Sequence, residues 1–206
     1  MDLTFIVNCS AGPFLKKQQF KKRGNTYYKY DDKAFYAIYF YSIGLCSYYV
    51  MPFFIPCNFE YLTYGDQLSI SLFSKEKRPD NQTIEQWTNK FIDEYFSTIK
   101  PFFQAFSLFL DSSEKSFGYP QRVCTDIEIS RLMLFLFLYR GDLINAKEEL
   151  AKYEELLLHG NFFSKRVVEK REAEVKEIYN AISQGEYQIK EYISQTILNT
   201  KKVLRI

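Results

Sequence analysis

The sequence is poor in the residues on which most catalytic and metal chemistry depends. His159 is the one histidine among the 206 residues, which excludes a histidine pair and a histidine-rich metal site. The eight glycines form no phosphate-binding loop or dinucleotide fingerprint, and no serine lies in a G-x-S-x-G motif. We therefore expect no cofactor and no metal, and a non-catalytic role is favoured over an enzymatic one.

Cysteines are few, and long apolar runs are missing. The cysteines are Cys9, Cys46, Cys57 and Cys124. They form no C-x-x-C pair, which predicts reduced, mostly buried thiols of a cytoplasmic protein, although a disulfide between Cys46 and Cys57 stays as an alternative. No run reaches the ~20 apolar residues that a bilayer requires. Residues 1–12 lack the basic start and long apolar core of a signal peptide, so we expect no membrane association.

Neither sign of charge is in excess. The chain has 27 basic and 25 acidic residues and a net charge of +2, which is too balanced to indicate nucleic acid from overall charge. Hydrophobic residues make up 47% and aromatic residues 18% of the sequence, which favours a globular protein with an aromatic core over a disordered chain. The abundance of Phe, Tyr and Lys would fit an AT-rich bacterial genome.

Aromatic and β-branched residues dominate the stretch from Ala34 to Phe73, where only Glu60 and Asp66 are charged. This composition suits a half-buried pleated surface better than a helix. We therefore expect a small antiparallel sheet. Its four predicted strands are Thr26–Tyr30, Ala34–Ser42, Cys46–Phe54 and Asp66–Phe73.

Helices are expected before and after the sheet along the sequence. The first spans Asp2–Gln19 and is kinked or restarted at Gly12-Pro13. A second begins at Thr83, carries Trp87 at helical spacing and should cover the apolar face of the sheet. Pro101 should either kink this helix or start another one, Phe102–Leu110.

The remainder of the chain reads as helical. Ile127–Tyr139 and Leu143–Leu158 form a predicted hairpin, and a long helix follows from Ser164 to about Leu204, which Gly185 is expected to end or bend. Its apolar stripe either closes the domain or pairs with a partner helix, so a homodimer through 164–204 is one option. The predicted fold class is α+β, with an α+β domain at 1–120 and a helical part at 121–206 packed on it.

The basic element Lys21–Tyr30 and the lysines before it are the best candidate for a contact surface. Cations are interleaved here with tyrosines, a pattern that suits single-stranded nucleic acid or an acidic protein face. The alternative is a solvated hairpin whose tyrosines pack inward. The candidate binding residues are Lys21, Lys22, Arg23, Asn25, Tyr27 and Tyr28.

Other polar residues are better explained by local structure. Asp31 and Asp32 are adjacent, so on a strand their carboxylates would diverge, and we expect them to act in a turn. His159 is predicted at a helix end beside Gly160, where a cation meets the helix dipole favourably.

The segment FLKKQQFKKRGNTYYKY, followed by YAIYFYSIGLCSYYVMPFFIP, resembles a bacterial family known as domain of unknown function number four thousand three hundred and four. The resemblance covers roughly residues 2–110. Its matching element is Phe20, Lys21, Lys22, Gly24, Asn25, Thr26, Tyr27 and Tyr28. The resemblance implies an opening helix, sheet strands and a long helix, but no activity. Gln19 stands where a glycine is expected, so the turn before Phe20 is expected to differ.

Two classes of function remain. The first is a non-catalytic protein-interaction module in the cytoplasm, of the immunity or regulatory type, that occupies a toxin or an enzyme. The second is a nucleic-acid- or nucleotide-binding protein or enzyme that uses the basic aromatic face from Lys21 to Tyr30. A pocket of convergent polar groups near Lys22 and Asn25 would favour the second class.

Overall fold

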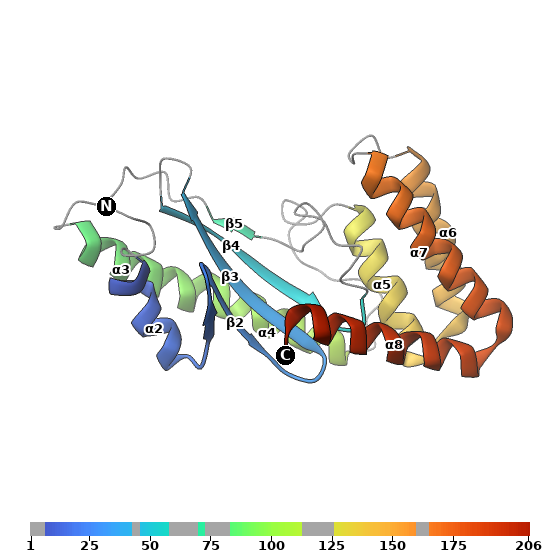
Figure 1. The fold of residues 1–206 in the computed structure, drawn as a ribbon. Coiled ribbons are helices and arrows are strands. Elements are labelled where there is room, and N and C mark those ends of the chain that lie inside the picture. The colour runs from blue at the N-terminus through green and yellow to red at the C-terminus, as the bar shows by residue number, and fades with distance from the viewer. Residues whose placement is uncertain (1–6, 43–45, 58–69, 73–82, 113–125, 160–164) are drawn as a thin grey trace. The chain divides into compact units, whose positions relative to one another are not determined.

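The computed structural model describes residues 7–42, 46–57, 70–72, 83–112, 126–159 and 165–206 (Figure 1). The chain divides into two compact units. Unit 1 contains residues 1–53 and 68–113, and unit 2 contains residues 54–67 and 114–206. The predicted α+β fold class is confirmed. The predicted domain boundary at residue 120 lies outside the described residues.

Across the described residues the sheet has five strands in the order β1-β2-β3-β4-β5. Their bounds are Lys21–Arg23, Thr26–Tyr30, Ala34–Ser42, Cys46–Phe54 and Ile70–Leu72. The pairs β1–β2, β2–β3 and β4–β5 are antiparallel. The bounds of β2, β3 and β4 are those predicted. Of the fourth predicted strand, Asp66–Phe73, residues 70–72 form β5 and the rest lies outside the described residues.

Strand β1 was not among the four predicted strands. Its three residues are all cations, so it has no alternation of polar and apolar positions. The strand forms because Gly24 and Asn25 make a two-residue turn that places Arg23 opposite Thr26, and Gly24 supplies the positive φ, 56°, that such turns favour.

One face of the sheet is covered by helices, as predicted. Helix α3 (Thr83–Glu94), the π-helical turn η2 (Tyr95–Ile99) and α4 (Lys100–Asp111) follow one another and run behind the strands in Figure 1. Trp87 is 4% exposed, and its ring centroid lies 6.4 Å from that of Phe40. Phe91 lies 5.7 Å from Phe40 and 5.2 Å from Tyr48. Pro101 lies in the first turn of α4, and the residues around it, Ile99 and Lys100, keep right-handed helical dihedrals, so the helical backbone continues from η2 into α4.

The first predicted helix restarts at Ala11, since α2 spans Ala11–Lys17; residues 1–6 are outside the described part. Helix α2 ends in a Schellman motif, in which the N–H groups of Gln19 and Phe20 donate to the carbonyls of Lys16 and Leu15, both at 3.0 Å. Gln19 adopts φ 66°. The turn is therefore the left-handed one that glycine favours, formed here with glutamine.

Unit 2 contains helices α5 (Asp126–Arg140), α6 (Leu143–His159), α7 (Lys165–Gln184) and α8 (Glu186–Leu204). The predicted hairpin is α5–α6. The long helix predicted to run to about Leu204 ends and restarts at Gly185, the residue expected to end or bend it, whose φ of 98° separates α7 from α8. The apolar stripe is buried in the chain, through Val167, Val175, Ile178, Ala181, Ile189, Ile193 and Leu204.

Helix α8 is also tied to the segment that follows β4. The hydroxyl of Thr200 donates to the carbonyl of Cys57 at 2.9 Å, and both groups are buried. Among the described helices, none is both long and apolar enough to cross a bilayer.

Candidate binding site

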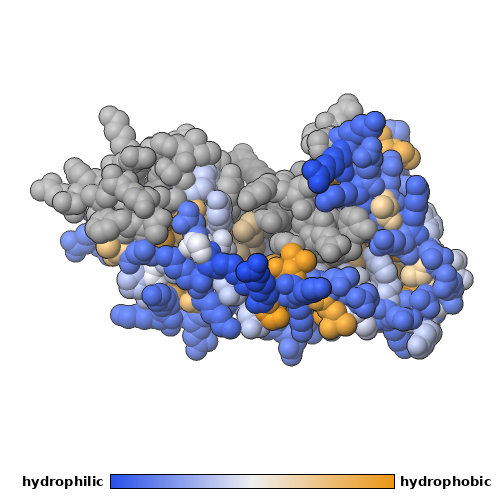
Figure 2. All heavy atoms as spheres, in the orientation of Figure 1, coloured by the Kyte–Doolittle hydropathy of each residue, from blue (hydrophilic) through white to orange (hydrophobic). Residues whose placement is uncertain are grey.

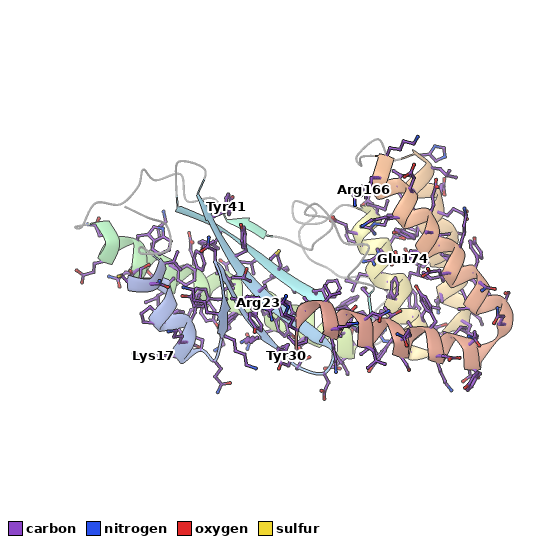
Figure 3. The ribbon with its side chains drawn as sticks, in the orientation of Figure 1. Lys17, Arg23, Tyr30, Tyr41, Arg166 and Glu174 are labelled. Atoms are coloured by element: carbon purple, nitrogen blue, oxygen red, sulfur yellow. The ribbon has the colours of Figure 1, made fainter. Side chains whose placement is uncertain are left out.

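The basic edge consists of Lys16 and Lys17 in α2 and Lys21, Lys22 and Arg23 in β1. All three β1 residues are exposed, because β1 is the outermost strand and pairs only with β2. Lys16 and Lys17 are exposed in the last turn of α2. Figure 3 labels Lys17 on α2 and Arg23 on β1, and hydrophilic residues cover most of this region in Figure 2.

Each cation of β1 lies over an aromatic ring. The distances to the ring centroid are 4.9 Å for Lys21 over Tyr30, 5.8 Å for Lys22 over Tyr27 and 5.2 Å for Arg23 over Tyr28. Lys21 also donates to the Tyr30 hydroxyl at 3.3 Å, and Lys22 donates to the side chain of Asn8. Such contacts hold the side chains in place but leave their positive charge intact.

The four lysines of this edge keep their charge unpaired among the described residues. Within the described part of the chain, Lys16, Lys17, Lys21 and Lys22 form no ion pair with Asp or Glu. The edge therefore presents a concentrated positive potential to an approaching molecule.

The tyrosines predicted to bind are packed inward. Tyr27 is fully buried and Tyr28 is 9% exposed, so neither ring has an open face for a ligand. A Cβ atom on Gly12 of α2 would collide with the Tyr27 hydroxyl, so α2 packs directly on this ring. Asn25 is half-buried, and its carbonyl accepts from the N–H of Phe40 at 3.0 Å. Of the six candidate residues, only Lys21, Lys22 and Arg23 lie on the surface.

A second feature of unit 1, here called the lysine pocket, lies between α4 and the end of the β2–β3 hairpin. It has a volume of about 290 Å³. Its lining residues are Lys29, Tyr30, Asp31, Tyr36, Lys100, Phe103, Gln104 and Ser107. An adjoining cavity of about 240 Å³ shares Asp31, Tyr36 and Ser107 and adds Asp32, Lys33, Ala34, Leu110 and Asp111.

Asp31 acts in the turn between β2 and β3, as predicted. Its Oδ1 accepts from the N–H groups of Lys33 at 2.9 Å and Ala34 at 2.7 Å, and its Oδ2 accepts from the Tyr36 hydroxyl at 3.4 Å. This is an Asx turn, in which the carboxylate replaces a backbone acceptor. Burial, opposed by the Ser107 hydroxyl and reinforced by Asp31, raises the pKa of Tyr36 to about 12.

Unit 2 contains a buried ionic cluster that sequence reasoning missed. The Nε and terminal nitrogen of Arg131 in α5 donate to the two oxygens of Glu174 in α7 at 2.8 and 2.6 Å. Arg171 donates to the Tyr153 hydroxyl at 2.7 Å, which in turn donates to Glu174 at 3.4 Å. Figure 3 labels Glu174 between α5 and α7. Burial alone would lower the pKa of Arg131, but the facing Glu174 carboxylate holds it well above its usual value.

The signal for this cluster is present in the sequence. Arg171 and Glu174 lie between Val167 and Ile178 at spacings of four, three and four residues, which puts them on the buried stripe of α7. All of these residues are at most 9% exposed. Charged residues at core positions of a helix indicate a buried ion pair. They are hard to recognise in α7, because many other charged residues of this helix lie on its solvated face.

The thiols and the histidine occupy ordinary positions. Cys9 is a free, exposed thiol and Cys57 a free, buried one, so Cys57 forms no disulfide with Cys46. Burial raises the pKa of Cys57 to about 12. His159 is the exposed last residue of α6. No group of three His, Cys, Asp or Glu side chains suited to a metal occurs among the residues described.

Comparison of the chain with protein-family models, with curated proteins and with solved structures finds no match. The resemblance of residues 2–110 to a domain of unknown function therefore stays an expectation from sequence. The arguments about function rest on the geometry of unit 1.

Proposed function

We propose that this protein is a non-catalytic interaction module that docks its basic edge on an acidic surface of a partner protein. The observation that carries the proposal is the exposed edge strand of three successive cations, flanked by two more on α2. Charges of this kind at the rim of an interface mainly accelerate encounter and select the partner. The buried tyrosines beneath them would hold the cations in fixed positions without taking part in contact.

The partner class that we favour is a toxin or an enzyme that is occupied by an immunity-type or regulatory binder. Such partners require rapid and selective capture, which electrostatic steering supplies. We further propose a bacterial cytoplasm as the location. The free thiols of Cys9 and Cys57 support a reducing compartment, because disulfides form and persist in oxidising ones.

A charge-reversal variant tests the proposal. Lys21→Glu, Lys22→Glu and Arg23→Glu together should slow association with the partner by about ten- to a thousand-fold. The thermal midpoint should be nearly unchanged, because all three side chains are exposed. The matched control reverses Lys147, Lys176 and Lys202, which are exposed cations of unit 2.

The measurement has two stages. Proteins that co-purify with the wild type but not with the basic-edge variant are identified by mass spectrometry from the native host. Association rates of the purified pair are then measured at low and high salt. Retention by the basic-edge variant, or equal loss in the unit 2 control, would show that the basic edge is not the docking surface.

A nucleic acid or nucleotide is the second candidate. The observation in its favour is Tyr30, which is 40% exposed and lies under Lys21, so one ring could stack on a base beside a cation. Tyr27 and Tyr28 offer no such face. Release of the bound material by nuclease, together with a steep salt dependence, would select this candidate over a protein partner.

A further inference from the structure

The lysine pocket holds two cations that share one small space. Lys29 in β2 is half-buried and Lys100, the first residue of α4, is exposed; both line the same cavity of about 290 Å³. Burial, and then the positive charge of Lys100, lower the pKa of Lys29, while Asp31 opposes this change. The Lys29 ammonium therefore lies within reach of the positive charge of Lys100.

The neighbouring carboxylate does not resolve this repulsion. Asp31 directs one oxygen to two backbone N–H groups of its turn and the other to the Tyr36 hydroxyl. Lys29 and Lys100 form no ion pair with Asp or Glu in the described ranges. Each instead lies over an aromatic ring, at 4.8 Å from the centroid of Phe20 and 5.6 Å from that of Phe96. The pocket thus keeps an excess of positive charge.

Other residues that line the lysine pocket add hydrogen-bond donors to the two lysine ammonium groups. Ser107 has a hydroxyl and Gln104 an amide in the same wall, and Phe103 packs on Tyr36 with ring centroids 5.0 Å apart. Two ammonium groups, a hydroxyl and an amide match a phosphate, which carries about −1.5 to −2 charges and three acceptor oxygens near pH 7. A carboxylate, with one charge and two oxygens, would leave part of this set unused.

We propose that the lysine pocket binds the phosphate group of a small phosphorylated molecule between Lys29 and Lys100. The adjoining cavity of about 240 Å³ receives the remainder of that molecule. Asp32 and Asp111 line this second cavity. One oxygen of Asp111 accepts from the Lys33 ammonium. Asp32 and the other oxygen of Asp111 would accept hydrogen bonds from hydroxyl groups, so the ligand class is a phosphate monoester of a hydroxylated compound. The pocket uses none of the cations of the basic edge.

Calorimetric titration of the full chain tests the proposal with glucose 6-phosphate and inorganic phosphate as probes, and with glucose and citrate as comparisons. The wild type should bind both phosphate probes at millimolar or lower concentration. Lys29→Met and Lys100→Met should each weaken this binding by at least about tenfold, because each removes a charged hydrogen-bond donor. Lys90→Met, an exposed cation of the same unit outside the basic edge, should leave it unchanged.

The unliganded variants provide an independent check. Lys29→Met removes one of two repelling cations, so its thermal midpoint without ligand should equal or exceed that of the wild type. Absence of phosphate binding by the wild type would overturn the proposal. So would equal affinity for citrate, or an equal effect of Lys90→Met. Failure of the basic edge to bind a protein would leave these results untouched.

Discussion

The Arg131–Glu174 pair allows the sharpest test of the energetics of unit 2. The Arg131 and Glu174 side chains are 5% and 0% exposed, and two hydrogen bonds join them. Removing one member of such a pair leaves a charge in a region without water. The loss in the free energy of unfolding is typically about 3 to 5 kcal/mol.

Three variants separate the contributions. Glu174→Gln keeps the shape but removes the negative charge that faces Arg131, and it also weakens the acceptor of the Tyr153 hydroxyl. Arg131→Met removes the cation. The double variant Arg131→Met/Glu174→Gln removes both charges, and its loss should be clearly smaller than the sum of the single losses, because no unpaired member of the pair remains.

Urea denaturation followed by far-ultraviolet circular dichroism measures these differences. With a slope of about 2 to 3 kcal/mol per M, a loss of about 3 kcal/mol lowers the midpoint by about 1 M or more. The exposed Glu186–Lys190 pair, also at 2.6 Å, is the control, and Glu186→Gln should give no resolvable shift. A wild-type midpoint for Glu174→Gln, or losses that simply add in the double variant, would refute this reasoning.

Three further outcomes are expected. Gln19→Gly should raise the free energy of unfolding by about 1 kcal/mol, because it relieves the left-handed strain at φ 66°; an unchanged or lower thermal midpoint would contradict this. Gly12→Ala should destabilise by about 1 to 3 kcal/mol, because the added Cβ meets the Tyr27 hydroxyl and a backbone oxygen; Tyr27→Phe in the same chain should restore part of the loss, and a neutral Gly12→Ala would show that α2 moves freely. Burial raises the pKa of Cys57 from 9.0 to about 12. The protonated thiol therefore contributes fully to the free energy of unfolding below pH 9, and this contribution is lost between pH 9 and 12, at about 1.4 kcal/mol per pH unit. Cys57→Ala should flatten that decline in denaturation measured against pH, and an identical slope would exclude this thiol as its source.

The sheet was predictable because aromatic and β-branched residues dominate its strands. In β3 residues of both faces are apolar and buried, from Ala34 to Ile38 and again at Phe40 and Tyr41. Such a composition favours a strand over a helix, but it does not tell which face the helices cover. The bounds of β2, β3 and β4 followed from sequence alone.

The features that escaped prediction depend on partners distant in sequence. Strand β1 has no apolar alternation and exists through its pairing with β2. The lysine pocket joins Lys29 and Lys100, which no local spacing relates to each other. In the basic element, the cations were correctly predicted to be exposed, but Tyr27 and Tyr28, which lie on opposite faces of β2, are both buried.

The bond between Thr200 and Cys57 has a consequence for synthesis on the ribosome. Unit 1 takes all of its residues from the chain up to Ser113, so it can assemble while the C-terminal helices are still being translated. The hydroxyl that donates to the Cys57 carbonyl belongs to Thr200, which is synthesised 143 residues later. At ordinary elongation rates this is a delay of about 7 to 30 s. During that interval the Cys57 carbonyl lacks its hydroxyl partner, so this buried hydrogen bond of unit 2 is among the last contacts of the chain to form.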